Sequence, residues 1–99
     1  MTPSHHRTAE SALEKKFHRA VRRDLGGRVF KLAPTVKGMP DRLVLLPGGE
    51  VHLVELKAAD GALSPAQRVW HDRAAALGTR VVVLYGWQDI LGWLRQRAR

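Results

Sequence analysis

The sequence predicts one compact α/β domain in which a central mixed sheet is flanked by helices. Three observations support this fold class. Apolar residues recur at helical spacing in residues 8–25, strand-like segments surround a glycine turn in residues 41–57, and residues 64–96 follow a helix–strand–helix pattern. The chain has 99 residues, of which 44% are hydrophobic, and this is enough for a single core. The expected order is α-β-β-β-α-β-α, over one domain spanning residues 1–99, with a flexible segment at residues 1–7.

The first helix is expected from residue 8 to residue 25, and Gly26-Gly27 should end it. Its apolar residues repeat every fourth position and predict the face that packs on the core. These residues are Leu13, Phe17, Val21 and Leu25. Residues 28–33 have strand composition, and residues 33–40 are expected to form a loop.

A hairpin is expected next, with strands at residues 41–46 and 50–57. Pro47-Gly48-Gly49 is a short connection of the kind that joins antiparallel strands. If this turn places Leu46 opposite Glu50, the register of the whole hairpin is fixed. A glycine bulge in the turn would shift the register by one residue.

The second half of the chain predicts a helix, a strand and a helix. Ser64 followed by Pro65 is typical of an N-cap and first helical residue, and the helix should run to about Leu77. The almost entirely apolar residues 80–85 predict a buried strand, which parallel pairing would suit. The closing helix, at residues 87–96, has an apolar side composed of Trp87, Ile90, Leu91 and Leu94.

The composition favours an intracellular protein that binds nucleic acid. The chain carries 17 Lys and Arg, 12 of them Arg, against nine Asp and Glu, so its formal charge is +8. Arginine makes forked contacts with phosphate, which favours a polyanion over charge for solubility alone. Because the chain has no cysteine, no apolar run long enough to span a membrane and no secretory signal, we expect a cytoplasmic protein that does not contact membranes.

Three charged residues occupy the hairpin where apolar side chains would be expected. With Leu46 opposite Glu50, Asp41 would lie opposite Glu55 on one face, at about 5 Å. Side chains alternate along a strand, so Lys57 shares the face of Glu55. Glu and Lys on such a strand can form an ordinary exposed ion pair. The combination of Gly-x-Pro-Asp, a hairpin and Glu-x-Lys is more specific, and it favours a functional site.

Two carboxylates this close repel each other unless a cation lies between them. Their oxygen atoms suit a hard divalent ion, so we expect Mg²⁺, with Mn²⁺ able to substitute. The backbone carbonyl of Leu56 could add a ligand, and Lys57 could orient water or neutralise charge on a phosphate. The first helix adds Glu10 and Glu14, which fall among its apolar residues, and one of the two is expected to reach the metal. The sequence does not choose between them.

The motifs Gly-x-Pro-Asp-Arg-Leu-Val-Leu-Leu-Pro-Gly-Gly, Val-Glu-Leu-Lys and Gly-x-Leu-Ser-Pro-x-Gln resemble those of the VRR-NUC family, a branch of the PD-(D/E)XK nuclease superfamily. The resemblance covers nearly the whole chain and is to short stand-alone members from phage and bacteria. It implies a restriction-endonuclease-like core and a divalent-metal-dependent nuclease. Metal ligands would be Asp41, Glu55 and Glu10 or Glu14, with Lys57 as the catalytic lysine, Gln67 beside the site and Lys31 at a basic position. It also implies Holliday-junction or flap DNA as substrate and a homodimer, acting near the bacterial nucleoid.

Phosphate contacts are expected from a subset of basic residues, namely Lys15, Arg19, Arg22, Lys31, Arg42 and Arg68. His71 is more readily explained as a surface or packed residue, and the tryptophans as core or interface residues. Two alternatives to a nuclease remain open: a basic nucleic-acid-binding module with a structural ion cluster, and an adaptor that binds a protein partner through its tryptophans.

Overall fold

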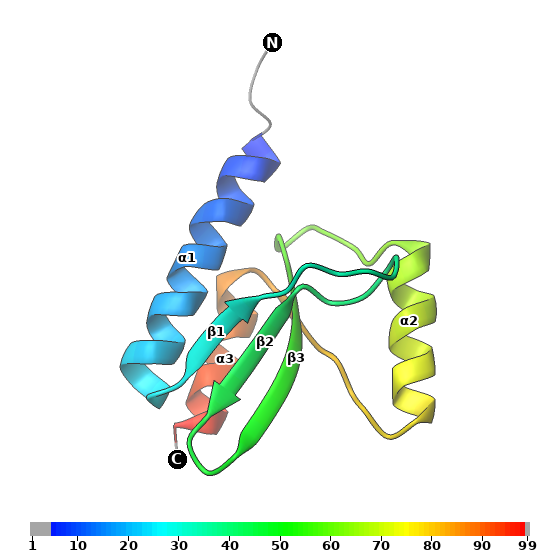
Figure 1. Cartoon of the computed structure of the whole chain (residues 1–99). Coiled ribbons are helices and arrows are strands. Elements are labelled where there is room, and N and C mark those ends of the chain that lie inside the picture. The colour runs from blue at the N-terminus through cyan, green and yellow to red at the C-terminus, as the bar shows by residue number, and fades with distance from the viewer. Residues whose placement is uncertain (1–4, 99) are drawn as a thin grey trace.

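The computed structural model describes the backbone of residues 5–98 and the side chains of residues 11–98 (Figure 1). The elements are α1 (His5–Leu25), β1 (Arg28–Lys31), β2 (Arg42–Leu46), β3 (Glu50–Lys57), α2 (Pro65–Ala76), β4 (Val82–Tyr85) and α3 (Gly86–Arg97). The predicted element order is therefore confirmed. Residues 5–7 belong to α1, which begins earlier than expected. The remainder of the expected flexible segment, residues 1–4, lies outside the described residues.

One four-stranded sheet organises the fold, in the order β1-β2-β3-β4. The pairs β1–β2 and β2–β3 are antiparallel, and β3–β4 is parallel as expected. Leu46 pairs with Glu50 across the turn, so the predicted register of the hairpin is confirmed. Gly48 and Gly49, with φ of 84° and 81°, allow this tight connection because glycine has no Cβ to clash in that backbone region.

The hydrophobic core lies between one face of the sheet and the pair of helices α1 and α3, which contact each other (Figure 1). Its fully or almost fully buried members are Phe17, Ala20, Val21, Val44, Leu46, Val54, Leu84, Ile90, Trp93 and Leu94. The predicted core residues of α1 are among these or pack against them. In α3 the structure adds Trp93, which the expected apolar side did not include. This core anchors α1 and β3, which carry Glu14 and Glu55.

The other face of the sheet is less covered than the sequence suggested. Helix α2 stands apart from α1 and α3 (Figure 1), and of its residues only Ala74 is buried. Strand β4 lies at the edge of the sheet, and Val82, Val83 and Tyr85 are only half-buried. The expectation of a buried strand is therefore confirmed only in part: Val81 and Leu84 are buried, but β4 has a neighbour on one side only. Among the described residues, no helix is long and apolar enough to cross a membrane.

Candidate active site

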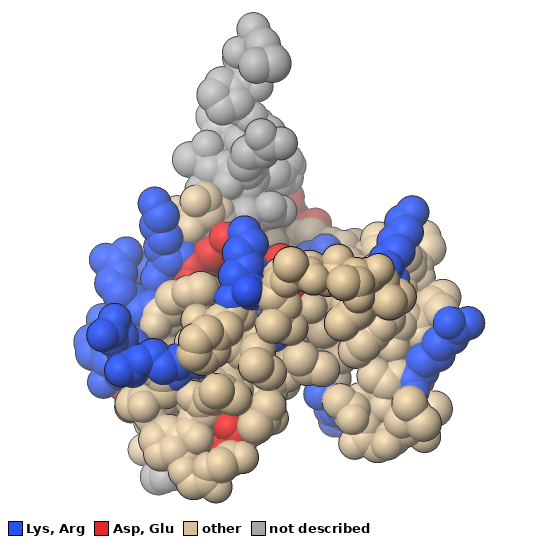
Figure 2. Space-filling model, in the orientation of Figure 1, with Lys and Arg blue, Asp and Glu red and all other residues tan. Residues whose placement is uncertain are grey.

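The hairpin brings Asp41 and Glu55 to the same end of the sheet. Continuing the β2–β3 register by one residue beyond the Arg42–Val54 pair sets Asp41 opposite Glu55. Both side chains line a small polar cavity of about 120 Å³. The other lining residues are Leu13, Glu14, Leu56 and Lys57. In Figure 2 acidic side chains lie close to lysine and arginine side chains on one face of the molecule. The structure thus gathers acids from α1, from the residue before β2 and from β3 beside one lysine.

Glu55 is the most electrostatically perturbed group of this cavity. Its side chain is 6% exposed, and its Oε1 atom has no hydrogen-bond partner. Burial and, secondarily, the charge of Asp41 raise the pKa of Glu55 to about 7, although Lys57 and Arg42 oppose this shift. A carboxylate in this position is stabilised by any cation that replaces the lost water. The electrostatics of the cavity therefore favour the binding of a cation next to Glu55.

Glu14 is the acid of α1 that the structure places in this cavity. It forms a 2.5 Å ion pair with Nη2 of Arg42, and Asp41 lies 3.0 Å from Nη1 of the same guanidinium. The side chain of Glu10, the alternative left open by the sequence, lies outside the described side chains. Glu14 is therefore the α1 carboxylate that lies in position to act as a metal ligand.

Arg42 occupies a different environment from the one expected. It is 1% exposed, because strand alternation turns it, together with Val44 and Leu46, toward the face covered by α1. Its guanidinium pairs with Glu14 and Asp41 and so holds two acids of the cavity. The expectation that Arg42 contacts phosphate is wrong for this reason: a buried, doubly paired guanidinium does not reach the surface.

The loop before β2 carries Asp41 toward the first turn of α2. Gly38 lies in this loop with φ of 93°, and a Cβ there would stand 2.3 Å from the carbonyl oxygen of Ala66. Only glycine permits this close approach. The backbone amide of Leu32 also donates to the carbonyl of Asp41 at 2.8 Å, which fixes the start of β2. Asp41 and Glu55 consequently share a second, more open cavity of about 450 Å³ with the start of α2.

Gln67 and Lys31 line this open cavity with both acids. Gln67 was expected beside the site, whereas Lys31 was expected only at a basic position. Gln67 also caps α2. The side-chain Oε1 of Gln67 accepts a hydrogen bond from the backbone amide of Ser64 at 2.8 Å, and the backbone amide of Gln67 donates one to Oγ of Ser64 at 3.1 Å. This capping box explains why Gln67 is needed structurally. A catalytic role for Gln67 stays a prediction.

His71, which was interpreted from the sequence as a surface or packed residue, is partly buried and lies beside Glu55. Its Nε2 lies 4.0 Å from Oε1 of Glu55, and both atoms are buried without a hydrogen-bond partner. Burial lowers the pKa of His71, and Lys57 contributes to the lowering. The helical position of His71, one turn after Gln67, was the available signal. His71 thereby covers Glu55 from the side of α2 and limits its access to water.

The donor set suits a hard divalent cation, and the structure shows what such an ion would have to displace. Carboxylates of Asp41, Glu55 and Glu14 are ligands of this class, and Glu55 is the one without a partner. Among the described residues, no three acidic or histidine side chains already stand close enough to hold one ion. Arg42 engages two of the three acids, so ion binding would require Asp41 or Glu14 to exchange the guanidinium for the cation.

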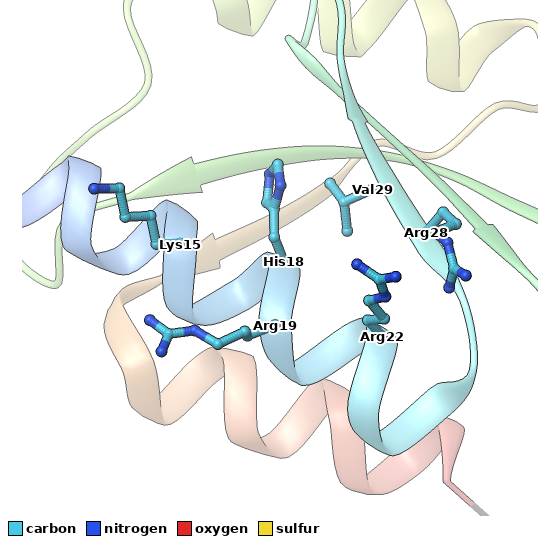
Figure 3. A pocket seen from close by; sticks show the side chains of 6 residues that line it. All are labelled: Lys15, His18, Arg19, Arg22, Arg28 and Val29. Carbon is cyan, nitrogen blue, oxygen red and sulfur yellow. The ribbon is translucent and has the colours of Figure 1, made fainter.

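The remaining basic residues expected to contact phosphate lie in separate places. Lys15, Arg19 and Arg22 are exposed on α1 and line a pocket separate from the acidic cavity (Figure 3), whereas Arg68 is exposed on α2. Trp93 is buried between Phe17 and His52, and Trp87 packs against the core beneath Lys16. The interpretation of these two tryptophans as core residues is confirmed.

Comparisons with known proteins agree with this architecture. The family model described as the VRR-NUC domain matches residues 2–88. The chain is 42% identical over 76 residues to "Putative nuclease p44" of Acyrthosiphon pisum secondary endosymbiont phage 1, covering 76% of this chain and 81% of that protein. A solved structure titled "VRR_NUC domain" superposes with a TM-score of 0.70 at 26% identity, covering 94% of this chain and 97% of the other.

Proposed function

The chain belongs to the VRR-NUC domain family, and we propose that it is a divalent-metal-dependent DNA endonuclease that hydrolyses phosphodiester bonds at branched structures such as four-way junctions or flaps. The coarser conclusion, a nuclease, is supported by the family and by the phage relative. The observation that supports metal-dependent hydrolysis is the convergence of Glu14, Asp41, Glu55 and Lys57 on one polar cavity, and the preference for branched DNA rests on the family resemblance.

Asp41, Glu55 and Glu14, with the backbone carbonyl of Leu56, are the groups that would hold Mg²⁺ or Mn²⁺. When bound, such an ion supplies Lewis-acid polarisation of the phosphate and lowers the pKa of bound water. Burial of Glu55 keeps water away from its carboxylate, so charge interactions in the cavity are strong. A cation there relieves the repulsion between Glu55 and Asp41.

Lys57 has the role of a positioned positive charge. It lies two residues after Glu55 on the same face of β3 and lines the same cavity. Its ammonium can donate to a non-bridging phosphate oxygen or to the attacking water, and it neutralises charge that develops on the phosphate. Gln67 and Lys31, at the open cavity next to it, are placed to contact the same strand of DNA.

The cluster of Arg42 with Glu14 and Asp41 favours one alternative, in which these acids serve only a structural ion network in a nucleic-acid-binding module. Cleavage assays separate the two. We expect the protein, incubated with Mg²⁺ or Mn²⁺, to cut labelled four-way and flap DNA faster than linear duplex of the same sequence. Binding to all three substrates without cleavage above the background of a Lys57→Met variant would reject the enzyme and favour the binding module.

The exposed apolar face of the sheet supports the expected homodimer. Phe30, Leu45 and Val51 are 48%, 40% and 58% exposed, and by register they all point away from α1 and α3. A contiguous apolar surface of this kind commonly marks an interface. Two copies joined through a twofold axis would bury it and would place two active sites on symmetric strands.

Val51→Lys should therefore convert a dimer into a monomer, because it places a charge on this apolar face. Light scattering coupled to size exclusion measures the mass directly. Val36→Lys is the matched control, since Val36 is similarly exposed but lies in the loop before β2. A wild-type protein that is monomeric across the concentrations used for cleavage would contradict the dimer.

A further inference from the structure

Another pocket, distinct from both cavities that contain Asp41 and Glu55, is lined almost entirely by basic side chains. It lies between α1 and the start of β1 and has a volume of about 420 Å³, within the range of about 300–1,000 Å³ that is usual for ligand sites. Its lining residues are Lys15, His18, Arg19, Arg22, Arg28 and Val29 (Figure 3). His18 and Arg22 extend from α1 toward the strand that carries Val29 and Arg28 (Figure 3). Among the residues whose side chains the structure describes, none that lines this pocket is acidic.

These basic side chains are available to a ligand. Lys15, Arg19, Arg22 and Arg28 are exposed, and within the described part of the chain none of them lies within 4.0 Å of a carboxylate. Within residues 11–98, Arg28 is the one of these four that forms an intramolecular hydrogen bond, from its Nη1 to the carbonyl of Gly27 at 2.9 Å. By contrast, Arg23 is paired with Asp24 and Arg42 with two acids. Four like charges around one hollow repel each other unless an anion lies among them.

The pocket begins next to the acidic cavity. His18 lies within the electrostatic influence of Glu14, Arg42 and Lys31, and its pKa is lowered by burial and by the charge of Arg42. Glu14, His18 and Arg22 follow one another at four-residue intervals on one side of α1. At 1.5 Å per residue, His18 and Arg22 lie about 6 Å and 12 Å along the helix axis from Glu14. DNA advances about 3.4 Å per nucleotide along its axis, so this distance corresponds to about two to four nucleotides.

We propose that this pocket, which we call the α1–β1 basic pocket, binds consecutive backbone phosphates of the DNA strand on one side of the scissile phosphate, about two to four nucleotides from it. The inference rests on the proposed function, because the acidic cavity marks the point of cleavage. Lys15, Arg19, Arg22 and Arg28 neutralise the phosphates and set the position of the strand. They contact no base in this role, so binding is independent of sequence.

The test measures DNA binding without cleavage. Binding of a fluorescent four-way junction by wild type and by the double variant Arg19→Ala/Arg22→Ala is followed by anisotropy in EDTA over a series of salt concentrations. Each lost phosphate contact lowers the slope of log affinity against log salt by about 0.9, so the double variant should lose about 2. The matched control is Arg80→Ala/Arg95→Ala, which removes the same charge at exposed positions outside the pocket. The control should retain the wild-type slope.

A second arm locates the contact. A methylphosphonate, which removes one phosphate charge, is placed two to four nucleotides from the cut on either side. It should weaken wild-type binding on one side only and should not weaken the double variant further. Equal slopes for the double variant and the control, in folded proteins, would overturn the inference. The predicted loss of slope in the double variant, together with no metal-dependent cleavage by wild type, would instead reject the proposed function while leaving phosphate binding by the pocket intact, so the two failures are distinguishable.

Discussion

Replacing Lys57 by methionine is expected to lower the rate of Mg²⁺-dependent cleavage by about 10²–10³-fold, the usual effect of removing one group that stabilises charge in the transition state. Lys57 lines the acidic cavity, and its charge is felt by both Glu55 and His71. Methionine preserves much of the length of the side chain and removes only the ammonium. Affinity for DNA should change little, because one half-buried charge of many is lost.

Single-turnover cleavage of a labelled junction measures this effect without interference from product release. Lys16→Met is the matched control, because Lys16 lies exposed over Trp87, 4.3 Å from the ring centre, and does not line the acidic cavity. The control should cleave at the wild-type rate. A Lys57→Met variant that cleaves within a few fold of wild type would remove lysine from the mechanism.

Glu55→Gln should make the metal-free protein more stable at pH 8 than wild type, while abolishing its response to metal. An acid whose pKa is raised from 4.5 to about 7 on folding keeps its proton in the folded state after the unfolded chain has lost it. The free energy of unfolding therefore falls as pH rises from about 4.5 to about 7 and stays low above this range. The shift corresponds to about 3 kcal/mol at most, at 1.36 kcal/mol per pKa unit. Glutamine is neutral and avoids this loss.

Urea unfolding in EDTA at pH 5.5 and pH 8 measures both effects. Wild type should be more stable at the lower pH, whereas the variant should show a smaller difference. Adding Mn²⁺ at pH 8 should stabilise wild type only. Glu50→Gln, an exposed position on the same strand, controls for loss of one acid. A variant that is less stable than wild type at pH 8 without metal would show that the ionised carboxylate of Glu55 does not destabilise the folded protein.

The features that could be predicted from the sequence depend on local chemistry. The Pro47-Gly48-Gly49 turn fixed the pairing of Leu46 with Glu50, and this register carried Asp41 to Glu55 because strand geometry leaves little freedom between them. The start of α2 was equally local, since Ser64 and Pro65 specify it within one turn.

The features that could not be predicted depend on how distant elements pack. Helical spacing allowed both Glu10 and Glu14, and only the packing of α1 against β2 brings Glu14 to Arg42. Arg42 was assigned to phosphate from its charge alone, because its burial depends on α1 rather than on β2. His71 reaches Glu55 because of how α2 is placed, apart from α1 and α3 (Figure 1), and periodicity within α2 does not specify this placement.

The central claim is that one divalent cation binds between Asp41 and Glu55. Crystals of the wild-type protein grown with Mn²⁺, and measured at a wavelength where manganese scatters anomalously, test it most directly. We predict one anomalous peak in contact with both carboxylates, and no peak at this position in crystals of the Glu55→Gln variant. Wild-type crystals in which Asp41 remains paired with Arg42 and no manganese lies beside Glu55 would contradict the claim.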